Sequence, residues 1–143
     1  PMVPMAAAAG LGQIGLHTML VTRMWGARVR LGAVLTDMPL QEDKPVDFGL
    51  SDFCERCGLC AKLCVGKAIS KKGDFDEHRC MKAWKKMGTD CGVCMIACPF
   101  SQGVDDELLT KVKGQESRSI IAARFGKRPY IEKPLPIVKW SKI

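Results

Sequence analysis

The chain has 143 residues, enough for one domain or for one small domain with an appendage, which excludes several independent cores. Its formal net charge is +7, yet the basic pairs are scattered and lack interleaved aromatic residues, so a nucleic-acid-binding surface is not indicated. Glycines and polar residues interrupt the apolar start at residues 2–21, so no transmembrane segment is predicted. The chain opens on Pro1 without the charged start of a signal peptide, and we expect it to begin partway through a larger protein.

Four segments are predicted before residue 50. Residues 5–9 are rich in alanine and favour a short helix that ends at Gly10. Residues 19–22 and 29–36 are β-branched, mostly apolar runs, and the residues between them read as a turn, so the two runs predict a β-hairpin. Residues 37–48 carry two prolines and four acidic residues, which indicates a connector rather than an element.

A cysteine-rich region follows at residues 51–103. Short helices are expected after Cys54 and after Cys91, where closely spaced cysteines lead into apolar turns. A small strand is expected around residues 74–76.

Helices also dominate the prediction for the second half of the chain. Residues 80–87 should be helical, with Trp84 packed inward. Residues 105–112 begin with acidic side chains that suit a helix N-terminus, and residues 117–125 form a further helix candidate. Three prolines from position 129 onward predict an extended tail.

All eight cysteines of the chain lie in two groups beyond residue 50. The first group has the spacing Cys-x2-Cys-x2-Cys-x3-Cys and consists of Cys54, Cys57, Cys60 and Cys64. This is the bacterial ferredoxin motif, in which three cysteines hold one [4Fe-4S] cluster and the fourth reaches to a second cluster. Three thiolates on a turn that enters a short helix converge on one cube, so the spacing predicts iron–sulfur electron transfer.

The second group repeats the motif with an insertion. Its members are Cys80, Cys91, Cys94 and Cys98, and ten residues separate the first two where the uninterrupted motif has two. Crossed ligation then assigns four cysteines to each of two clusters. The first set is Cys54, Cys57, Cys60 and Cys98, and the second is Cys64, Cys80, Cys91 and Cys94.

Three other uses of eight cysteines are weaker interpretations. Structural zinc takes two Cys-x2-Cys pairs separated by a longer loop, which is not this spacing. Disulfides belong to small secreted domains, and cysteines three apart on one turn pair poorly. Unrelated buried thiols would not repeat a motif. Two oxidised clusters with their thiolates would also lower the net charge to roughly +3, so part of the basic excess is counter-charge.

A glycine fingerprint near the start suggests a further alternative. Gly10, Gly12 and Gly15 fit G-x-G-x-x-G, and Asp37 follows at a distance typical of dinucleotide-binding units. That mechanism requires a buried strand before the first glycine and a full helix after the last, and the sequence predicts neither. We therefore expect these glycines to allow close backbone approach or to form turns.

Several segments resemble a known family. They are Ala-Gly-Leu-Gly-Gln-Ile-Gly at residues 9–15, Val-Arg-Leu-Gly-Ala-Val-Leu-Thr-Asp-Met-Pro-Leu at 29–40, Lys-Pro-Val-Asp-Phe-Gly at 44–49, and the interrupted second cysteine motif at 80–94. Together they resemble the C-terminal half of corrinoid-dependent reductive dehalogenases across residues 6–100. Epoxyqueuosine reductase, a related cobalamin and iron–sulfur enzyme, is similar in the glycine segment but less so at residues 44–49 and around Trp84.

The resemblance implies a cobalamin held beside one [4Fe-4S] cluster, with reduced cobalt cleaving a carbon–halogen bond. Carried over by position, the corrinoid-binding residues would be Gly12, Gly15, His17, Thr18, Gly32, Ala33, Val34 and Leu35. The family leaves cobalt without a histidine ligand, so His17 is not expected to coordinate it.

Two departures limit what the resemblance carries. Val65 replaces the proline that usually follows the fourth cysteine, which reduces local rigidity without removing a ligand. The tyrosine acid and the basic residue that the family uses at the substrate lie in a region that this chain mostly lacks. Tyr130, the only tyrosine, lies in the tail and is a poor match for that acid.

The expected fold class is α+β: a ferredoxin-like domain with two clusters and short helices at residues 51–103, preceded by a fragment of an α/β corrinoid-binding domain at residues 1–50. A helical segment and tail occupy residues 104–143. The expected function is electron transfer to a corrinoid in reductive dehalogenation of an organohalide, with a donor protein or quinol-linked donor and an upstream catalytic region or partner chain. A corrinoid-free, ferredoxin-like carrier subunit, an epoxyqueuosine reductase-like enzyme and a nucleotide-binding oxidoreductase are the alternatives. The resemblance implies either the cytoplasm or the outer face of the cytoplasmic membrane.

Overall fold

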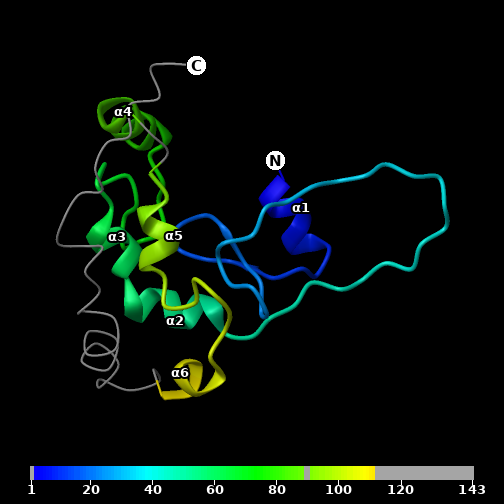
Figure 1. Ribbon diagram of the computed structural model, residues 1–143. Coiled ribbons are helices and arrows are strands. Elements are labelled where there is room, and N and C mark those ends of the chain that lie inside the picture. Colours follow the sequence, from blue (N-terminus) through cyan, green and yellow to red (C-terminus); the bar gives the residue numbers. More distant parts are fainter. Residues whose placement is uncertain (1, 89–90, 112–143) are drawn as a thin grey trace.

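A computed structural model describes residues 2–88 and 91–111 of the chain, and Figure 1 shows its arrangement. In chain order the elements are α1 (Met2–Ala8), β1 (Gln13–Ile14), β2 (Leu20–Val21), α2 (Leu50–Cys57), α3 (Leu59–Leu63), α4 (Glu77–Met87), α5 (Val93–Ala97) and α6 (Asp106–Lys111). The fold is a small α+β arrangement of short helices with one two-stranded sheet, as the sequence predicts for the class. No helix of the described residues is long and apolar enough to cross a membrane.

The predicted hairpin is wrong in its second strand. β2 lies within the predicted run 19–22, but it pairs antiparallel with β1, in the register Gln13 with Val21 and Ile14 with Leu20. The chain reverses through a tight turn, in which the backbone N–H of Thr18 donates to the carbonyl of Gly15 at 2.8 Å. Strand β2 therefore already has β1 as its pairing partner, and residues 29–36 are not part of the sheet.

Residues 29–36, predicted as the second strand, lie instead in a long segment without regular structure between β2 and α2. Figure 1 shows this segment extending well away from the helices. Val34 and Leu35 are 91% and 98% exposed. The apolar, β-branched pattern is therefore real in the sequence, but the described residues provide it no partner strand. The connector predicted for residues 37–48 is likewise without helix or strand.

One hydrophobic core joins the glycine-rich start to the cysteine region. Its buried members are Val21, Ala27, Leu50, Phe53, Cys98 and Phe100. The rings of Phe53 and Phe100 lie 4.5 Å apart between centroids and are tilted by 45°. Burial of each ring contributes about 1.5–3 kcal/mol to stability. The boundary predicted near residue 50 therefore separates two sequence regions that share a core.

A glycine allows the closest approach between these two regions. Gly26 has φ of 64°, and a Cβ added there would overlap the carbonyl oxygen of Phe100. The next residue, Ala27, donates its backbone N–H to that same carbonyl at 3.0 Å. The backbone that follows Cys98 is thus fixed against the start of the chain.

The two short helices α3 and α5 are built in the same way. Each has five residues, follows a glycine in the left-handed conformation, Gly58 or Gly92, and ends at a cysteine with extended backbone, Cys64 or Cys98. The two helices pack against each other. The repeated cysteine spacing is therefore matched by a repeated backbone conformation.

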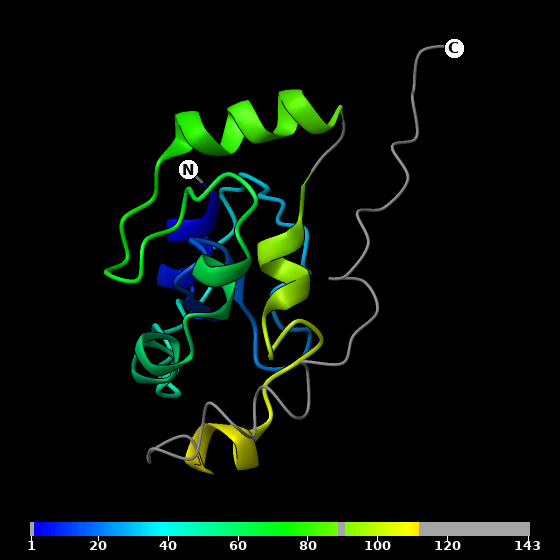
Figure 2. The same cartoon turned by 90° about the vertical axis from the view of Figure 1, so that its left-hand side faces the viewer.

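Helix α4 confirms the helix predicted over residues 80–87 and begins three residues earlier. Asp76 caps its N-terminus by accepting from the backbone N–H of Arg79 at 3.0 Å, and Gly88 ends it with φ of 69°. The inward packing predicted for Trp84 is wrong, because its side chain is 44% exposed and α4 has no buried residue. Figures 1 and 2 show α4 lying over α3 and α5, at the end of the molecule away from α6.

The remaining predicted elements have mixed outcomes. Helix α1 confirms the helix expected at residues 5–9, with an earlier start, and Gly10 follows it with φ of 75°. The strand expected around residues 74–76 is reduced to a single bridge between Ile69 and Phe75. Helix α6 lies within the predicted range 105–112, whose last residue is outside the described part, as are the predicted helix at 117–125 and the tail.

Candidate metal centres and the adjoining cavity

The structure gathers four cysteines around the start of α3 and the end of α5. Cys54 and Cys57 lie on α2, Cys60 on α3, and Cys98 ends α5. The pKa of Cys98 is raised to about 12, mainly by burial, and the negative charges of Cys54, Cys57 and Cys60 add to the effect. Such mutual influence requires short separations. These four residues are the first ligand set predicted from the spacing.

A second set of four cysteines surrounds the other end of the α3–α5 pair. Burial raises the pKa of Cys94, and the charges of Cys91, Cys64 and Cys80 raise it further. Cys80 likewise has a raised pKa through burial and the charges of Cys91 and Cys64. The spacing predicts this same set, although metal ligation by either set stays a prediction.

The two sets meet through α3 and α5. The pKa of Cys60 is raised to about 12, first by burial and next by its own set, and the charge of Cys94 in the other set contributes as well. The two sets are therefore adjacent, with Cys54 beside the turn between β1 and β2 and Cys80 on α4.

Backbone N–H groups near the cysteines favour the thiolate form. Ala68 donates to Sγ of Cys64 at 3.2 Å. The backbone at Leu16, Leu59, Ala61, Met95 and Phe100 lowers the pKa of Cys54, Cys57, Cys60, Cys94 and Cys98, respectively, against the larger effect of burial. Such bonds favour thiolate, which is the form that binds iron, and they tune cluster potentials.

The chemistry of this donor set suits iron–sulfur clusters. All eight cysteines are free thiols, either buried or partly buried. Within residues 2–88 and 91–111, no three His, Cys, Asp or Glu side chains converge tightly enough to hold a single metal ion. Ligands of a four-iron cube stand at its separate corners, so a cluster accepts a wider spacing than one ion does.

A cavity of about 630 Å³ opens beside Cys54. Three segments line it: the turn between β1 and β2, helix α2, and a glycine-containing turn before α4. The lining residues are Ile14, Gly15, Leu16, Thr18, Ser51, Cys54, Glu55, Lys71, Lys72 and Gly73. One wall of the cavity therefore carries a ligand of the first cysteine set.

The predicted corrinoid-binding positions are divided by the structure. Gly15 and Thr18 line the cavity. Gly12 instead lies against β2, where an added Cβ would overlap the carbonyl oxygen of Val21. The four positions of the predicted strand, Gly32, Ala33, Val34 and Leu35, lie on the exposed segment and do not line the cavity.

His17 lies beneath the cavity wall rather than in it. Its side chain is 2% exposed, Nδ1 accepts from the backbone N–H of Met19 at 3.2 Å, and Nε2 is buried without a partner among the described residues. An added Cβ at Gly15 would lie 2.9 Å from Cε1 of the imidazole, so the ring supports the backbone of the wall. Burial lowers the pKa of His17 to about 4, which keeps the ring neutral. Thr18 then takes a positive φ of 63°, a strained conformation for threonine.

Sequence reasoning missed four polar residues of the cavity: Ser51, Glu55, Lys71 and Lys72. A partial signal existed for the first two, because they lie close to Cys54 in sequence, although the sequence predicted a helix only after Cys54 and α2 begins at Leu50. The lysines come from a turn that only the tertiary fold brings to α2.

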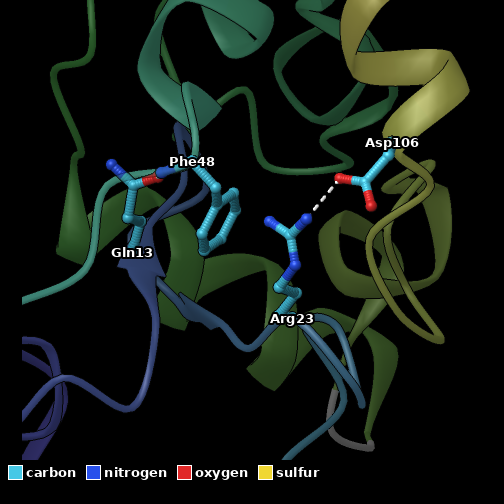
Figure 3. A network of polar contacts seen from close by, with 4 residues as sticks. All are labelled: Gln13, Arg23, Phe48 and Asp106. Carbon is cyan, nitrogen blue, oxygen red and sulfur yellow. Dashed lines mark hydrogen bonds and ion pairs between the residues drawn. The ribbon is translucent and has the colours of Figure 1, made fainter.

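Figure 3 shows Gln13, a residue of β1, beside Phe48, which lies just before α2. Oε1 of Gln13 accepts from the backbone N–H of Phe48 at 2.8 Å and from that of Leu50, the first residue of α2, at 3.3 Å. The Phe48 ring lies under the guanidinium of Arg23, which is 5.9 Å from its centroid and pairs with Asp106 at 2.6 Å. The start of α2, and with it Cys54, is therefore positioned by β1.

The order of elements excludes the nucleotide interpretation of the glycines. Helix α1 precedes Gly10 and strand β1 follows Gly12. A dinucleotide-binding unit has a strand before the glycines and a helix after them.

Comparison with known proteins relates the whole arrangement to one group of enzymes. No protein-family model matches the chain. It is 38% identical over 118 residues to the tetrachloroethene reductive dehalogenase of Sulfurospirillum multivorans, which covers 71% of this chain and 24% of that protein. It is 30% identical over 118 residues to the epoxyqueuosine reductase of Lactococcus garvieae, covering 72% and 32%.

Solved structures agree with the sequence matches. The catabolic reductive dehalogenase NpRdhA in complex with 3-bromo-4-hydroxybenzoic acid has a TM-score of 0.67 at 31% identity, over 90% of this chain and 22% of that chain. A further structure, which suggests a mechanism for B12-dependent dehalogenation, has a TM-score of 0.67 at 30% identity. The described fold is therefore similar to part of the reductive dehalogenase fold.

The chain is a homologue of the reductive dehalogenases, as its motifs predict. It spans less than a third of each curated relative named above, 24% of one and 32% of the other.

Proposed function

We propose that this chain is the electron-transferring, iron–sulfur part of a reductive dehalogenase-like protein, with two [4Fe-4S] clusters that pass electrons toward a corrinoid. One observation carries the proposal: two sets of four cysteines surround two helices of repeated conformation, α3 and α5. The first cluster would be held by Cys54, Cys57, Cys60 and Cys98. The second would be held by Cys64, Cys80, Cys91 and Cys94.

The arrangement of the two sets supports a direction of transfer. Helices α3 and α5 pack against each other, and the charge of Cys94 contributes to the raised pKa of Cys60, which supports two clusters that lie close together. Cys54 lines the cavity, so the first cluster would be the nearer one to a molecule bound there. An electron would then pass from the second cluster to the first and on to the cavity.

The cavity suits one face of a flat, polar cofactor. Gly15 presents backbone without a side chain, and Thr18, Ser51 and Lys72 supply polar groups around it. We propose that these residues hold part of a corrinoid, because a similar solved structure concerns B12-dependent dehalogenation and a glycine allows close approach of a flat ring. Bound there, the corrinoid would supply the cobalt at which reductive chemistry takes place. Gly12 and His17 would support the backbone of the cavity wall without touching the corrinoid. Residues 32–35 do not line this cavity, so a contact with the corrinoid would require parts of the protein beyond the described residues.

The proposed larger protein would bind the organohalide substrate, carry the proton-donating residue and receive electrons from the donor. The proposal places this chain toward the C-terminal end of that protein, with the substrate-binding residues on an upstream region or on a partner chain. Epoxyqueuosine reduction is the second candidate, because a homologue at 30% identity carries that name. A carrier subunit without corrinoid is the third.

Metal analysis of the full-length protein, purified without oxygen, tests the proposal. We expect about eight iron and eight sulfide per chain, and a brown absorbance that bleaches on reduction. Cobalt content and the corrinoid spectrum are measured on the same sample. Stoichiometric zinc in a colourless protein would refute the clusters, whereas full iron without retained cobalamin would favour the carrier subunit.

A further inference from the structure

Helix α4 carries a strongly basic face at the end of the molecule that holds Cys80. The helix lies directly on the turn after Cys64, where an added Cβ at Gly66 would be 2.8 Å from the carbonyl of Arg79 and 3.1 Å from Cβ of Ala83. Cys80, Ala83 and Met87 are partly buried and share this inner side. Figure 2 shows the opposite side of α4 facing away from α3 and α5.

The outer side of α4 is lined by cationic or titratable groups. His78, Lys82, Lys85 and Lys86 are all exposed, and their spacing of three and four residues gathers them on the face opposite Cys80. We call these four residues the α4 basic face. The only carboxylate within α4 is Glu77, at its first position, and Arg79 is already paired with Asp76 at 3.2 Å.

Helix stability alone does not account for this charge. Lys85 and Lys86 lie in the last turn, where positive charge complements the helix dipole. Lys82, however, lies a turn earlier, and its spacing to both lysines creates like-charge pairs that oppose helix formation. Met81 flanks the charged side at 50% exposure, and Trp84, at 44% exposure, lies between Met81 and the inner side. Exposed apolar and aromatic groups beside basic side chains are typical of a docking surface.

We propose that the α4 basic face docks an acidic, one-electron carrier protein that reduces the cluster containing Cys80. This inference rests on the proposed clusters and adds the site and the chemistry of the donor. A helix with side chains is about 10–12 Å across, so a carrier seated on the outer face would lie within about that distance of the Cys80 sulfur. One electron leaves the reduced carrier and enters the oxidised cluster, and no bond forms or breaks.

Charge complementarity would act mainly on the encounter rate. A surface of concentrated positive charge attracts a carboxylate-rich partner and orients it, and salt weakens this attraction. The reduction rate should therefore be fast at low ionic strength and fall as salt is added.

The test measures cluster reduction in the full-length, iron-loaded protein by stopped-flow absorbance. The donor is reduced flavodoxin, an acidic one-electron carrier, and methyl viologen radical serves as a small reductant that needs no docking. The variant is K82E/K86E. The control, R30E/K44E, makes the same charge change at exposed positions on the segment between β2 and α2, far from α4 in Figure 1.

We expect K82E/K86E to slow reduction by flavodoxin about tenfold or more at low salt and to change it little at high salt. Reduction by methyl viologen should change less than about threefold, and R30E/K44E should resemble the unmodified protein. Carbodiimide cross-linking should join flavodoxin carboxylates to Lys82, Lys85 or Lys86, as mapped by mass spectrometry, without depending on any enzymatic activity.

Equal slowing in both variants, or rates insensitive to salt, would overturn the docking site while leaving the clusters intact. Binding to vesicles of anionic lipid that K82E/K86E abolishes, without an effect on flavodoxin, would assign the face to a membrane surface instead. Absence of iron from the purified protein would refute the proposed function itself.

Discussion

The hydrogen bonds of Gln13 provide a direct test of how the glycine segment positions the cysteines. Replacement of Gln13 by alanine removes the acceptor of the backbone N–H groups of Phe48 and Leu50, while its bond to Asp47 is exposed and contributes little. The bond to Phe48, at 2.8 Å, is worth about 1 kcal/mol, and the longer one to Leu50 about half of that. We therefore expect the start of α2 to be destabilised by about 1.5 kcal/mol.

Amide hydrogen exchange of the iron-loaded protein measures this change locally. A loss of about 1.5 kcal/mol corresponds to roughly tenfold faster exchange in peptides that cover residues 46–54. Gln13→Glu retains an acceptor and should keep most of the protection. Gln41→Ala removes an exposed glutamine from the connector and serves as the control.

Equal exchange in the Gln13→Ala and Gln41→Ala proteins would refute the reasoning, because α2 would then be held by its core residues alone. Faster exchange throughout the chain would also contradict a local role. A loss restricted to the first turn of α2 would show that β1 fixes the helix that carries Cys54.

Three further predictions concern ligation, packing and pH. Cys98→Ser should deplete the cluster held by the α2 and α3 cysteines and spare the one nearest in sequence, as resolved by electron paramagnetic resonance; the opposite loss would contradict crossed ligation. Gly26→Ala, which forces a Cβ onto the carbonyl of Phe100 at φ of 64°, should cost about 2–4 kcal/mol in unfolding free energy. Gly32→Ala, with nothing within 4 Å, should change it by about 0.5 kcal/mol or less. Burial lowers the pKa of His17 from 6.5 to about 4, so between these pH values the imidazole is protonated in the unfolded chain and neutral in the folded chain. The free energy of unfolding should be independent of His17 protonation above a pH of about 6.5 and should fall by about 3 kcal/mol as the pH is lowered toward 4. His17→Gln should remove this dependence in denaturation curves, whereas His78→Gln, at an exposed site, should not.

Local signals explain which elements the sequence predicted well. The ends of α1 and α4 are marked by Gly10 and Gly88, and both glycines take the left-handed conformation that such ends require. The beginning of α4 was missed by three residues, although Asp76 is a capping residue of the expected type.

Tertiary context explains the failures. The run at residues 29–36 has strong strand character, but a strand also requires a pairing partner. The tight turn through Thr18 pairs β2 with β1, which precedes it, and not with residues 29–36. Trp84 lies toward the inner side of α4, yet α4 lies across the surface of α3 and α5 and buries no side chain fully. Neither outcome follows from the composition of the segment itself.

In the candidate site, too, some features follow from local sequence and others depend on the tertiary fold. The two sets of four cysteines follow from spacing, because the motif itself encodes which cysteine crosses to the other set. The cavity does not, since Lys71 and Lys72 reach it from a turn that only the folded chain brings beside α2.

Ten residues separate Cys80 from Cys91 where the uninterrupted motif has two, so the two halves of the motif are unequal, and this asymmetry supports a direction for the electron. Cys54, the leading cysteine of the first group, lies on α2 and packs against the shared core. The insertion instead places Cys80 on a separate surface helix, α4, while Cys54 faces the cavity. Under the proposed function, Cys80 would belong to the cluster nearer to a partner on α4, and Cys54 to the cluster beside the cavity. Two clusters in equivalent surroundings would exchange electrons equally well with a donor or an acceptor. The insertion would make them different, so that electrons enter at the cluster with Cys80 and leave from the cluster with Cys54.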